Sequence, residues 1–454
     1  MWIMDDSLPN IKSFFKGVEL SRSVRSHLIR FMISIIMRQG RNSCMNAAAA
    51  LSGQRRHRAQ PGRFLLRKRW RSLDILGQLV LHLLKNESWT GNYLLIVDST
   101  MVGHQGTSME NTYSTGNRRR RPAKHRRFSK YTYAGKSCHC FVFGLLVTPA
   151  GLRIPIMKPL YSRPYARQHS LKRRTQAQLA ALIIKEAPVP SGASVTVLGD
   201  TAFDAQVVRD ACDERAFTWI VPCNANRVLA GQRGQRPRVS SRIKQLSSCD
   251  FQSIRISPAA GTYASQRRLS KHREQAKKKT RTYYVHAEKQ QVHSVGQVLL
   301  VFSSTQPVQG EATRDSTKLL MTNATELSGR QVAELYGLRW QVEVFFKELK
   351  STLGMHQYQY RQFTAVEAWM EIVLITFVYL EWTRQTKLKD RRVAKATKEI
   401  WSRQRCYGLR QAVVIGIHIR SQKWIAKRLR SKNGLETLKK TMTQLLASEY
   451  RCAA

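Results

Sequence analysis

Acidic residues are scarce in this sequence, which has 29 Asp and Glu against 77 Lys and Arg among 454 residues, a formal net charge of +48. The basic excess recurs along the whole chain and is not confined to one tail. A positive field of this size concentrates phosphate polymers and makes their binding dependent on salt. The composition therefore predicts a polyanionic partner and favours nucleic acid over an anionic membrane surface or a basic protein without such a partner.

Paired cysteines, a secretory signal and a membrane-spanning run are also lacking. The eight cysteines are scattered without a C-x-x-C pair, which suits a reducing cytoplasm. The start, Met-Trp-Ile-Met-Asp-Asp, does not have a basic and then an apolar segment. The longest apolar run, Met370 to Trp382, is about 13 residues long and contains two glutamates, too short to cross a bilayer. We expect a cytoplasmic protein without a membrane partner.

The first 90 residues predict a helical region. Apolar residues recur at helical spacing from Ser21 to about Met37, and a second short helix, Asn42 to Leu51, ends at Gly53. A basic segment follows from Arg55 to Arg71. Residues 1–90 form either a DNA-binding unit, of helix-turn-helix character, or a plain helical prefix.

Strand and helix patterns alternate after residue 90. The run Tyr93 to Val97 predicts a buried strand that ends at Asp98, and Ser194 to Leu198 predicts another that closes at Gly199-Asp200. The intervening and following elements are expected to be strands at Cys138 to Thr148, Leu152 to Leu160 and Phe217 to Val221, with helices at Gln176 to Glu186 and Ala205 to Glu214. This order predicts an α/β sheet with covering helices over residues 91–384.

A β-rich insertion and a basic tail complete the expected organisation. Helical periodicity fails from about Asn224 to Thr282, and strand patterns return before Lys318 to Thr322, so we expect an insertion at about residues 224–316. Residues 385–454 are basic with a helical pattern, and we expect a C-terminal region that contacts DNA or a second subunit.

The segment from Tyr336 to Lys350 predicts one amphipathic helix. At about 100° per residue, Tyr336, Arg339, Glu343 and Lys350 share an arc of about 60°. The apolar residues of the segment gather on a separate stripe, as in a helix that packs on a core. Such a helix is commonly only a solvated surface element, but here one acid stands between Arg339 and Lys347, and two further acids end strands.

At these residues the sequence resembles the DDE transposases of the insertion-sequence-four type, marked by Y-(2)-R-(3)-E-(6)-K. Tyr336, Arg339, Glu343 and Lys350 match that spacing. The resemblance covers roughly residues 94–376 and implies a ribonuclease-H-like core with catalytic, metal-binding aspartates at two strand ends. Asp98 and Asp200 occupy those places.

The chemistry implied by this resemblance is phosphodiester cleavage and strand transfer. Two divalent ions, Mg²⁺ or Mn²⁺, would be held by Asp98, Asp200 and Glu343, since hard cations prefer carboxylate oxygens. The resemblance gives Arg339, Lys350 and Tyr336 to phosphate at the transposon end. Further candidate DNA contacts are Lys347 and the basic loop that contains Arg118, Arg119 and Arg120.

The expected partners are double-stranded DNA, as transposon ends and target, and a second copy of the chain in a homodimer. Two rival acids exist: Asp204, one turn past Asp200, and Glu348, which points away from the row of Tyr336, Arg339, Glu343 and Lys350 on a helical wheel. Two other functions remain open at this point: a catalytically inactive DNA-binding protein derived from a transposase, and a ribonuclease-H-like nuclease that does not transpose.

Overall fold

The fold was analysed in a computed structural model. It describes residues 8–37, 59–66, 70, 73–85, 87, 90–104, 108–114, 137–230, 236–256, 281–313, 316–404, 406–430, 433 and 436. The chain divides into two compact units, which we treat separately. The helical unit comprises residues 1–87, 102–139 and 347–454, and the sheet unit comprises residues 88–101 and 140–346.

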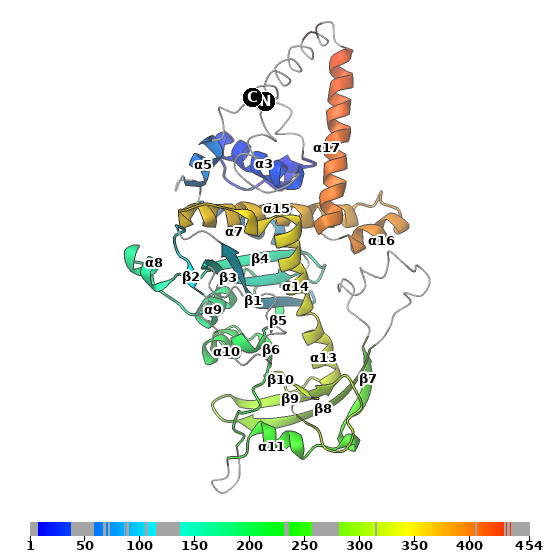
Figure 1. The fold of residues 1–454 in the computed structure, drawn as a ribbon. Helices are drawn as coiled ribbons and strands as arrows, with labels where there is room; N and C mark the ends of the chain where they lie inside the picture. Colours follow the sequence, from blue (N-terminus) through cyan, green and yellow to red (C-terminus); the bar gives the residue numbers. More distant parts are fainter. Residues whose placement is uncertain are drawn as a thin grey trace. The chain divides into compact units, whose positions relative to one another are not determined.

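The sheet unit begins with five strands in the order β4-β3-β1-β5-β6 (Figure 1). These strands are β1 (Asn92–His104), β3 (Ser137–Val147), β4 (Arg153–Pro159), β5 (Ser194–Leu198) and β6 (Thr218–Pro222). Strand β5 runs parallel to both β1 and β6, whereas β3 and β4 form an antiparallel hairpin. The expected mixed α/β architecture is confirmed.

The sheet continues beyond β6 in the order β10-β9-β8-β7, and each neighbouring pair in this part is antiparallel. The strands are β7 (Gln252–Ile256), β8 (Arg281–Val292), β9 (Gly296–Ser304) and β10 (Lys318–Thr322). Strands β7 to β9 fall in the sequence between β6 and β10, where the insertion is expected, together with α11 (Val239–Lys244) and η4 (Ser248–Asp250).

Helices of the sheet unit follow from local sequence signals. α9 (Gln176–Glu186) begins with a capping box between Thr175 and Gln178, and its apolar face is buried. Gly144 of β3 allows this helix to approach closely, because a Cβ atom there would lie 2.4 Å from Ile183. The other helices before β6 are α8 (Arg163–Gln168), η3 (Thr201–Phe203) and α10 (Gln206–Asp213), and α10 packs against α9.

The expectation of one continuous helix from Tyr336 to Lys350 is wrong. Three elements occur instead: α13 (Gly329–Gly337), α14 (Trp340–Lys347) and η5 (Glu348–Thr352), the last a π-helical turn. After Gly337, four backbone N–H groups donate to the carbonyl three residues back, those of Leu338, Arg339, Gln341 and Val342. This tighter winding breaks the regular 100° advance that the helical wheel assumed. Tyr336 is consequently buried and does not lie on an exposed polar face.

The helical unit is organised around α15 (Phe363–Lys389), which contacts most of the other long helices of that unit. Those helices are α3 (Arg22–Met37), α5 (Ala59–Leu66), α7 (Ile75–Leu84), α16 (Lys395–Arg403) and α17 (Cys406–Leu429). Shorter elements are α2 (Ile11–Phe14), β2 (Tyr113–Ser114) and η6 (Met355–Gln357). The expected helix at Ser21 to Met37 is confirmed as α3, whereas the one at Asn42 to Leu51 lies outside the described residues.

The helix α15 is longer than the apolar run that the sequence suggested. Of the helices in the described residues, α15 alone is long enough and apolar enough to cross a membrane by length and composition. However, 83% of its most apolar window is buried inside the protein. Its buried residues occur on every side of the helix from Phe363 to Gln385. This burial is the pattern of a central core helix.

Candidate active site

Asp98 and Asp200 lie close to the same end of two adjacent parallel strands. The pairing of β1 with β5 ends at Ile96 and Leu198, and each aspartate follows its paired residue by two positions. The carboxyl ends of parallel strands are where α/β sheets place their sites. The sequence led us to expect that the strand ends at Asp98, and this is wrong. Strand β1 runs on to His104 through residues that favour strands.

Asp200 caps the short helix η3. Its side chain accepts a hydrogen bond of 2.9 Å from the backbone N–H of Ala202, and its backbone is extended. Aspartate is favoured at such N-cap positions. The cap fixes the side chain just beyond β5 and occupies one of its two carboxylate oxygens.

Arg339 joins the first acid to the third. Its guanidinium lies 3.2 Å from Oδ2 of Asp98 and 2.6 Å from Oε1 of Glu343, one turn further along the chain. All three side chains are at least partly buried, with exposed fractions of 18%, 15% and 36%. Two carboxylates that are far apart in the sequence therefore share one cation.

The acids influence one another. The pKa of Asp98 is raised to about 6, first by burial and then by the charges of Asp200 and Glu343, while the backbone N–H of Ser99 and the Arg339 guanidinium act to lower it. A carboxyl group perturbed by burial and by like charges is typical of functional sites. The cluster holds more negative charge than its own cations neutralise.

Lys318 is a residue of this cluster that the sequence analysis missed. It begins β10, and its Nζ lies 5.0 Å from the centre of the Tyr336 ring. Burial and the Arg339 guanidinium lower the pKa of Lys318, whereas Glu343 raises it. Tyr336 is itself coupled to the site, because burial raises its phenol pKa to about 12, with opposing effects of Arg339 and Asp200. The sequence signal that could have indicated Lys318 is its place as a charged residue at the start of an apolar strand.

The other residues predicted to contact DNA lie in other elements or outside the described residues. Lys347 ends α14 and is exposed, and Lys350 lies in η5, where burial lowers its pKa. Both belong to the helical unit. Arg118, Arg119 and Arg120 lie outside the described residues.

The structure gives both rival acids other partners. Asp204 is 5% exposed and accepts hydrogen bonds from the guanidinium groups of Arg209 and Arg227, each with a contact of 2.6 Å. Glu348 is 6% exposed, and its Oε1 accepts a hydrogen bond from the backbone N–H of Cys406 in the helical unit. Their roles are structural.

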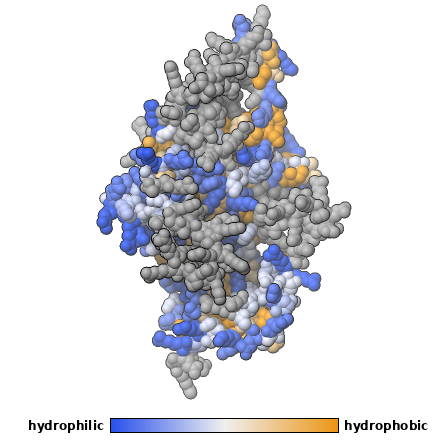
Figure 2. Space-filling model, viewed as in Figure 1, coloured by the Kyte–Doolittle hydropathy of each residue, from blue (hydrophilic) through white to orange (hydrophobic). Residues whose placement is uncertain are grey.

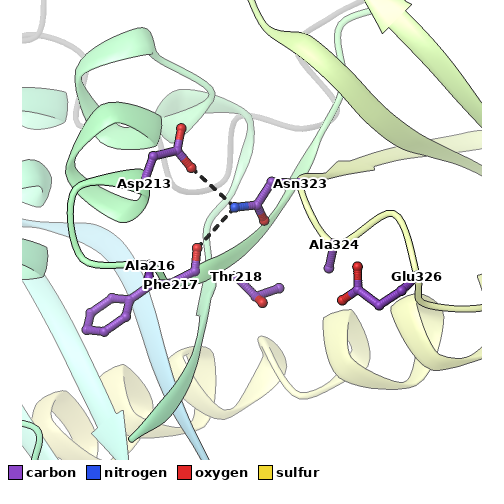
Figure 3. Close-up of a pocket in the computed structure, with 7 residues that line it drawn as sticks. All are labelled: Asp213, Ala216, Phe217, Thr218, Asn323, Ala324 and Glu326. Atoms are coloured by element: carbon purple, nitrogen blue, oxygen red, sulfur yellow. Dashed lines mark hydrogen bonds between the residues drawn. The ribbon is translucent and has the colours of Figure 1, made fainter. Parts of the chain in front are cut away.

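A shallow pocket of the sheet unit is lined by residues that do not belong to the acid cluster (Figure 3). Asn323 spans its wall, since its Nδ2 donates to Oδ1 of Asp213 and to the carbonyl of Phe217, and its Oδ1 accepts from the N–H of Trp219. No residue predicted for the active site lines this pocket. The polar groups of Asn323 are satisfied, which is what a structural side-chain clamp requires.

The donor chemistry of the acid cluster fits a hard divalent cation, because three carboxylates supply oxygen ligands. Within the described part of the chain, no three His, Cys, Asp or Glu side chains converge as a metal site. Arg339 explains this arrangement, because it pairs with two of the three carboxylates.

Comparison with known proteins agrees with this chemistry. Residues 89–379 match the family described as the transposase DDE domain, and they contain Asp98, Asp200 and Glu343. This match places the chain among nucleases of the transposase class. Because it covers more than half of the 454 residues, the chain belongs to the DDE transposase family, whose members act on DNA and use divalent metal ions. No curated protein matches the chain.

Proposed function

We propose that this protein cuts DNA at the ends of a mobile element and joins those ends to target DNA, as a transposase of the insertion-sequence-four type. One observation carries the proposal: Asp98 and Glu343 share the Arg339 guanidinium, and Asp200 acts electrostatically on the same Asp98. The motif residues Tyr336 and Arg339 also belong to this cluster.

The arrangement of elements supports a ribonuclease-H-like core. The chain order is a first strand, an antiparallel hairpin, a helix, a parallel strand, a second helix and a further parallel strand. The helices α13 and α14 then bring Arg339 and Glu343 to the aspartates. The division into residues 1–90, 91–384 and 385–454, with an insertion at about 224–316, stays a prediction beside the two compact units.

The three carboxylates would hold Mg²⁺ or Mn²⁺, and we propose two ions. When bound, such ions lower the pKa of a water nucleophile and compensate charge on the leaving oxygen. Asp98 is the central ligand in this assignment, because the other two acids already act on its charge. Its raised pKa of about 6 still leaves it mostly ionised at pH 7 to 8, where it can ligate a cation.

The cations and the phenol would hold the DNA phosphate. Arg339 offers a planar fork suited to two phosphate oxygens once it leaves a carboxylate, and Lys318 offers a point charge beside it. Water attacks phosphorus at the element's end, the P–O3′ bond breaks, and a 3′ hydroxyl is freed. That hydroxyl then attacks a target phosphodiester, so that one P–O bond forms as another breaks.

Lys347, Lys350 and the loop residues Arg118, Arg119 and Arg120 stay proposed DNA contacts. We further propose a homodimer on DNA, because two ends must be joined, and a location on the bacterial nucleoid in the cytoplasm. The net charge of +48 supports the DNA partner through its attraction for phosphate.

Cleavage of the element's own ends tests the proposal. Duplexes that carry the inverted repeats flanking the coding region are incubated with the full chain and Mg²⁺ or Mn²⁺. We expect nicks at the repeat ends that vanish with chelator and in D98N, D200N and E343Q. Glu334→Gln, on the exposed face of α13, is the matched control and should cut normally. DNA binding without nicking would instead support the catalytically inactive DNA-binding protein derived from a transposase. Cutting without joining, or an absence of flanking repeats, would support the ribonuclease-H-like nuclease that does not transpose.

A further inference from the structure

A dense group of cations lies between β4 and α9, away from the motifs that carry the proposed reaction. Residues 163–174, called the α8 platform here, contain Arg163, Arg167, Lys172, Arg173 and Arg174 and no acidic residue. All of these side chains are exposed except Arg174, which is half-buried. Figure 1 shows α8 standing out beside α9, and the same edge is hydrophilic in Figure 2.

The cations of the platform are not neutralised by the part of the protein that the structure describes. None of the five forms an ion pair or side-chain hydrogen bond with another described residue. Three other cations of the sheet unit do form ion pairs: Lys158 with Glu186, Lys185 with Glu214, and Arg330 with Glu334. The platform therefore presents a local charge that requires a partner outside it.

Local packing and hydrogen bonds hold the backbone beneath these cations. Tyr165 and Ala166 are buried, and the His169 ring packs 4.2 Å from the Tyr165 ring. The backbone N–H of Leu171 donates to the carbonyl of Ala166 over 2.8 Å, and the capping box at Thr175 begins α9 directly afterwards. An ordered backbone lowers the entropy that the cations lose when they bind an extended ligand.

We propose that the α8 platform binds the phosphate backbone of duplex DNA outside the catalytic carboxylates. The inference rests on the proposed function for its choice of partner. Arginine dominates the platform and matches phosphate oxygens with its planar fork. A membrane surface fits less well, because membrane-bound segments bury an apolar face in lipid, and here the aromatic side chain of Tyr165 is buried in the protein while Leu171 alone is an exposed large apolar residue of the segment.

The expected signature is a change in salt dependence. Each phosphate contact contributes about 0.9 to the slope of log K against log salt concentration. Loss of three contacts should therefore reduce the slope by roughly 2 to 3 and weaken binding at 0.1 M salt by about ten-fold or more. Contacts to phosphate do not read sequence, so a duplex of random sequence is a sufficient probe.

The experiment uses the full chain, a random duplex of DNA and chelator in place of divalent metal, so that catalysis does not contribute. The variant R163Q/R167Q/K172Q removes three unpaired cations. The control variant K158Q/K185Q/R330Q removes three cations that already pair with glutamates, with the same change in net charge. We expect a reduced slope only in the first variant, with thermal melting that matches the wild type.

Three outcomes overturn the platform: unchanged DNA binding, an equal loss in both variants, or a loss confined to RNA duplexes or phosphatidylglycerol vesicles. The result is separable from that of the cleavage test. A reduced slope without any nicking activity leaves the platform standing and removes the proposed reaction. Normal nicking with an unchanged slope does the opposite.

Discussion

Replacing Asp98 by Asn should abolish cleavage and yet stabilise the metal-free protein. The side chain is 15% exposed, and its pKa is raised to about 6 from an ordinary value of 3.8, first by burial and then by Asp200 and Glu343. A raised carboxyl pKa means that folding disfavours the ionised form. The contribution of this group to the free energy of unfolding is therefore at its maximum below pH 3.8, and it is lost as the pH rises through about 6.

The magnitude follows from that shift. About two pKa units at 1.36 kcal/mol each give an upper limit of about 3 kcal/mol for the ionised carboxylate at pH 8. The Arg339 ion pair is already included in the shift, because it is one of its lowering causes. Asn keeps an oxygen that accepts from the N–H of Ser99 but places an amide near the guanidinium, so we expect a gain of about 1 to 3 kcal/mol.

Urea unfolding of the wild type and D98N in chelator, at pH 4 and pH 8, measures this gain. The difference between the two proteins should be small at pH 4 and largest at pH 8, while E334Q should show no such pH dependence. Saturating Mg²⁺ should then raise the stability of the wild type more than that of D98N. Equal stability at both pH values, or a less stable D98N at pH 8, would refute the electrostatic account of the cluster.

Three further predictions follow from other side chains. Lys318→Gln should weaken binding and cleavage of end DNA and lower its salt slope by about 0.9, with rescue by Lys318→Arg; unchanged cleavage and slope would remove Lys318 from the site. Asp200→Asn should abolish cleavage at nearly constant melting temperature, because Asn caps as well as Asp. Asp204→Asn should instead lower stability by about 3 to 5 kcal/mol, because it leaves the buried Arg209 and the half-buried Arg227 with one neutral partner; the reverse order of stabilities would contradict these roles. In the helical unit, burial lowers the pKa of His104 to about 4 and also lowers that of His139, so stability should fall as the pH drops from 6.5 towards 4; His104→Gln should flatten this fall in circular dichroism melts, and an unchanged pH profile would count against it.

Local sequence signals predicted several elements closely. The helix α9 has its predicted bounds, Gln176–Glu186, because its capping box and apolar spacing act within a few residues. The strand Ser194–Leu198 also has its predicted bounds, because this short apolar run is buried between neighbouring strands. In these cases propensity, pattern and burial all agree.

Long-range contacts decided what the sequence did not reveal. A turn of tighter winding after Gly337 shifts the register between Tyr336 and Glu343, and periodicity cannot detect it. The partners of Asp204 lie up to 23 residues away, so a helical spacing from Asp200 could not show that Asp204 is neutralised. Lys318 reaches Tyr336 and Arg339 only because β10 pairs beside β6 in the folded sheet.

Arg339 is the residue whose contacts would change when the acid cluster binds metal and DNA as proposed. In the metal-free protein it is the cation that lets Asp98 and Glu343 lie close together at a position where burial and Asp200 oppose ionisation. A divalent ion carries twice its charge and is a better counter-ion for carboxylate oxygens, so an ion held there as proposed would weaken the attraction of these carboxylates for the guanidinium. Under the proposed function, the guanidinium fork would then bind the phosphate oxygens that enter with DNA. One arginine would in this way stabilise the acid cluster first and hold the substrate phosphate afterwards, so that metal and DNA binding would reinforce each other.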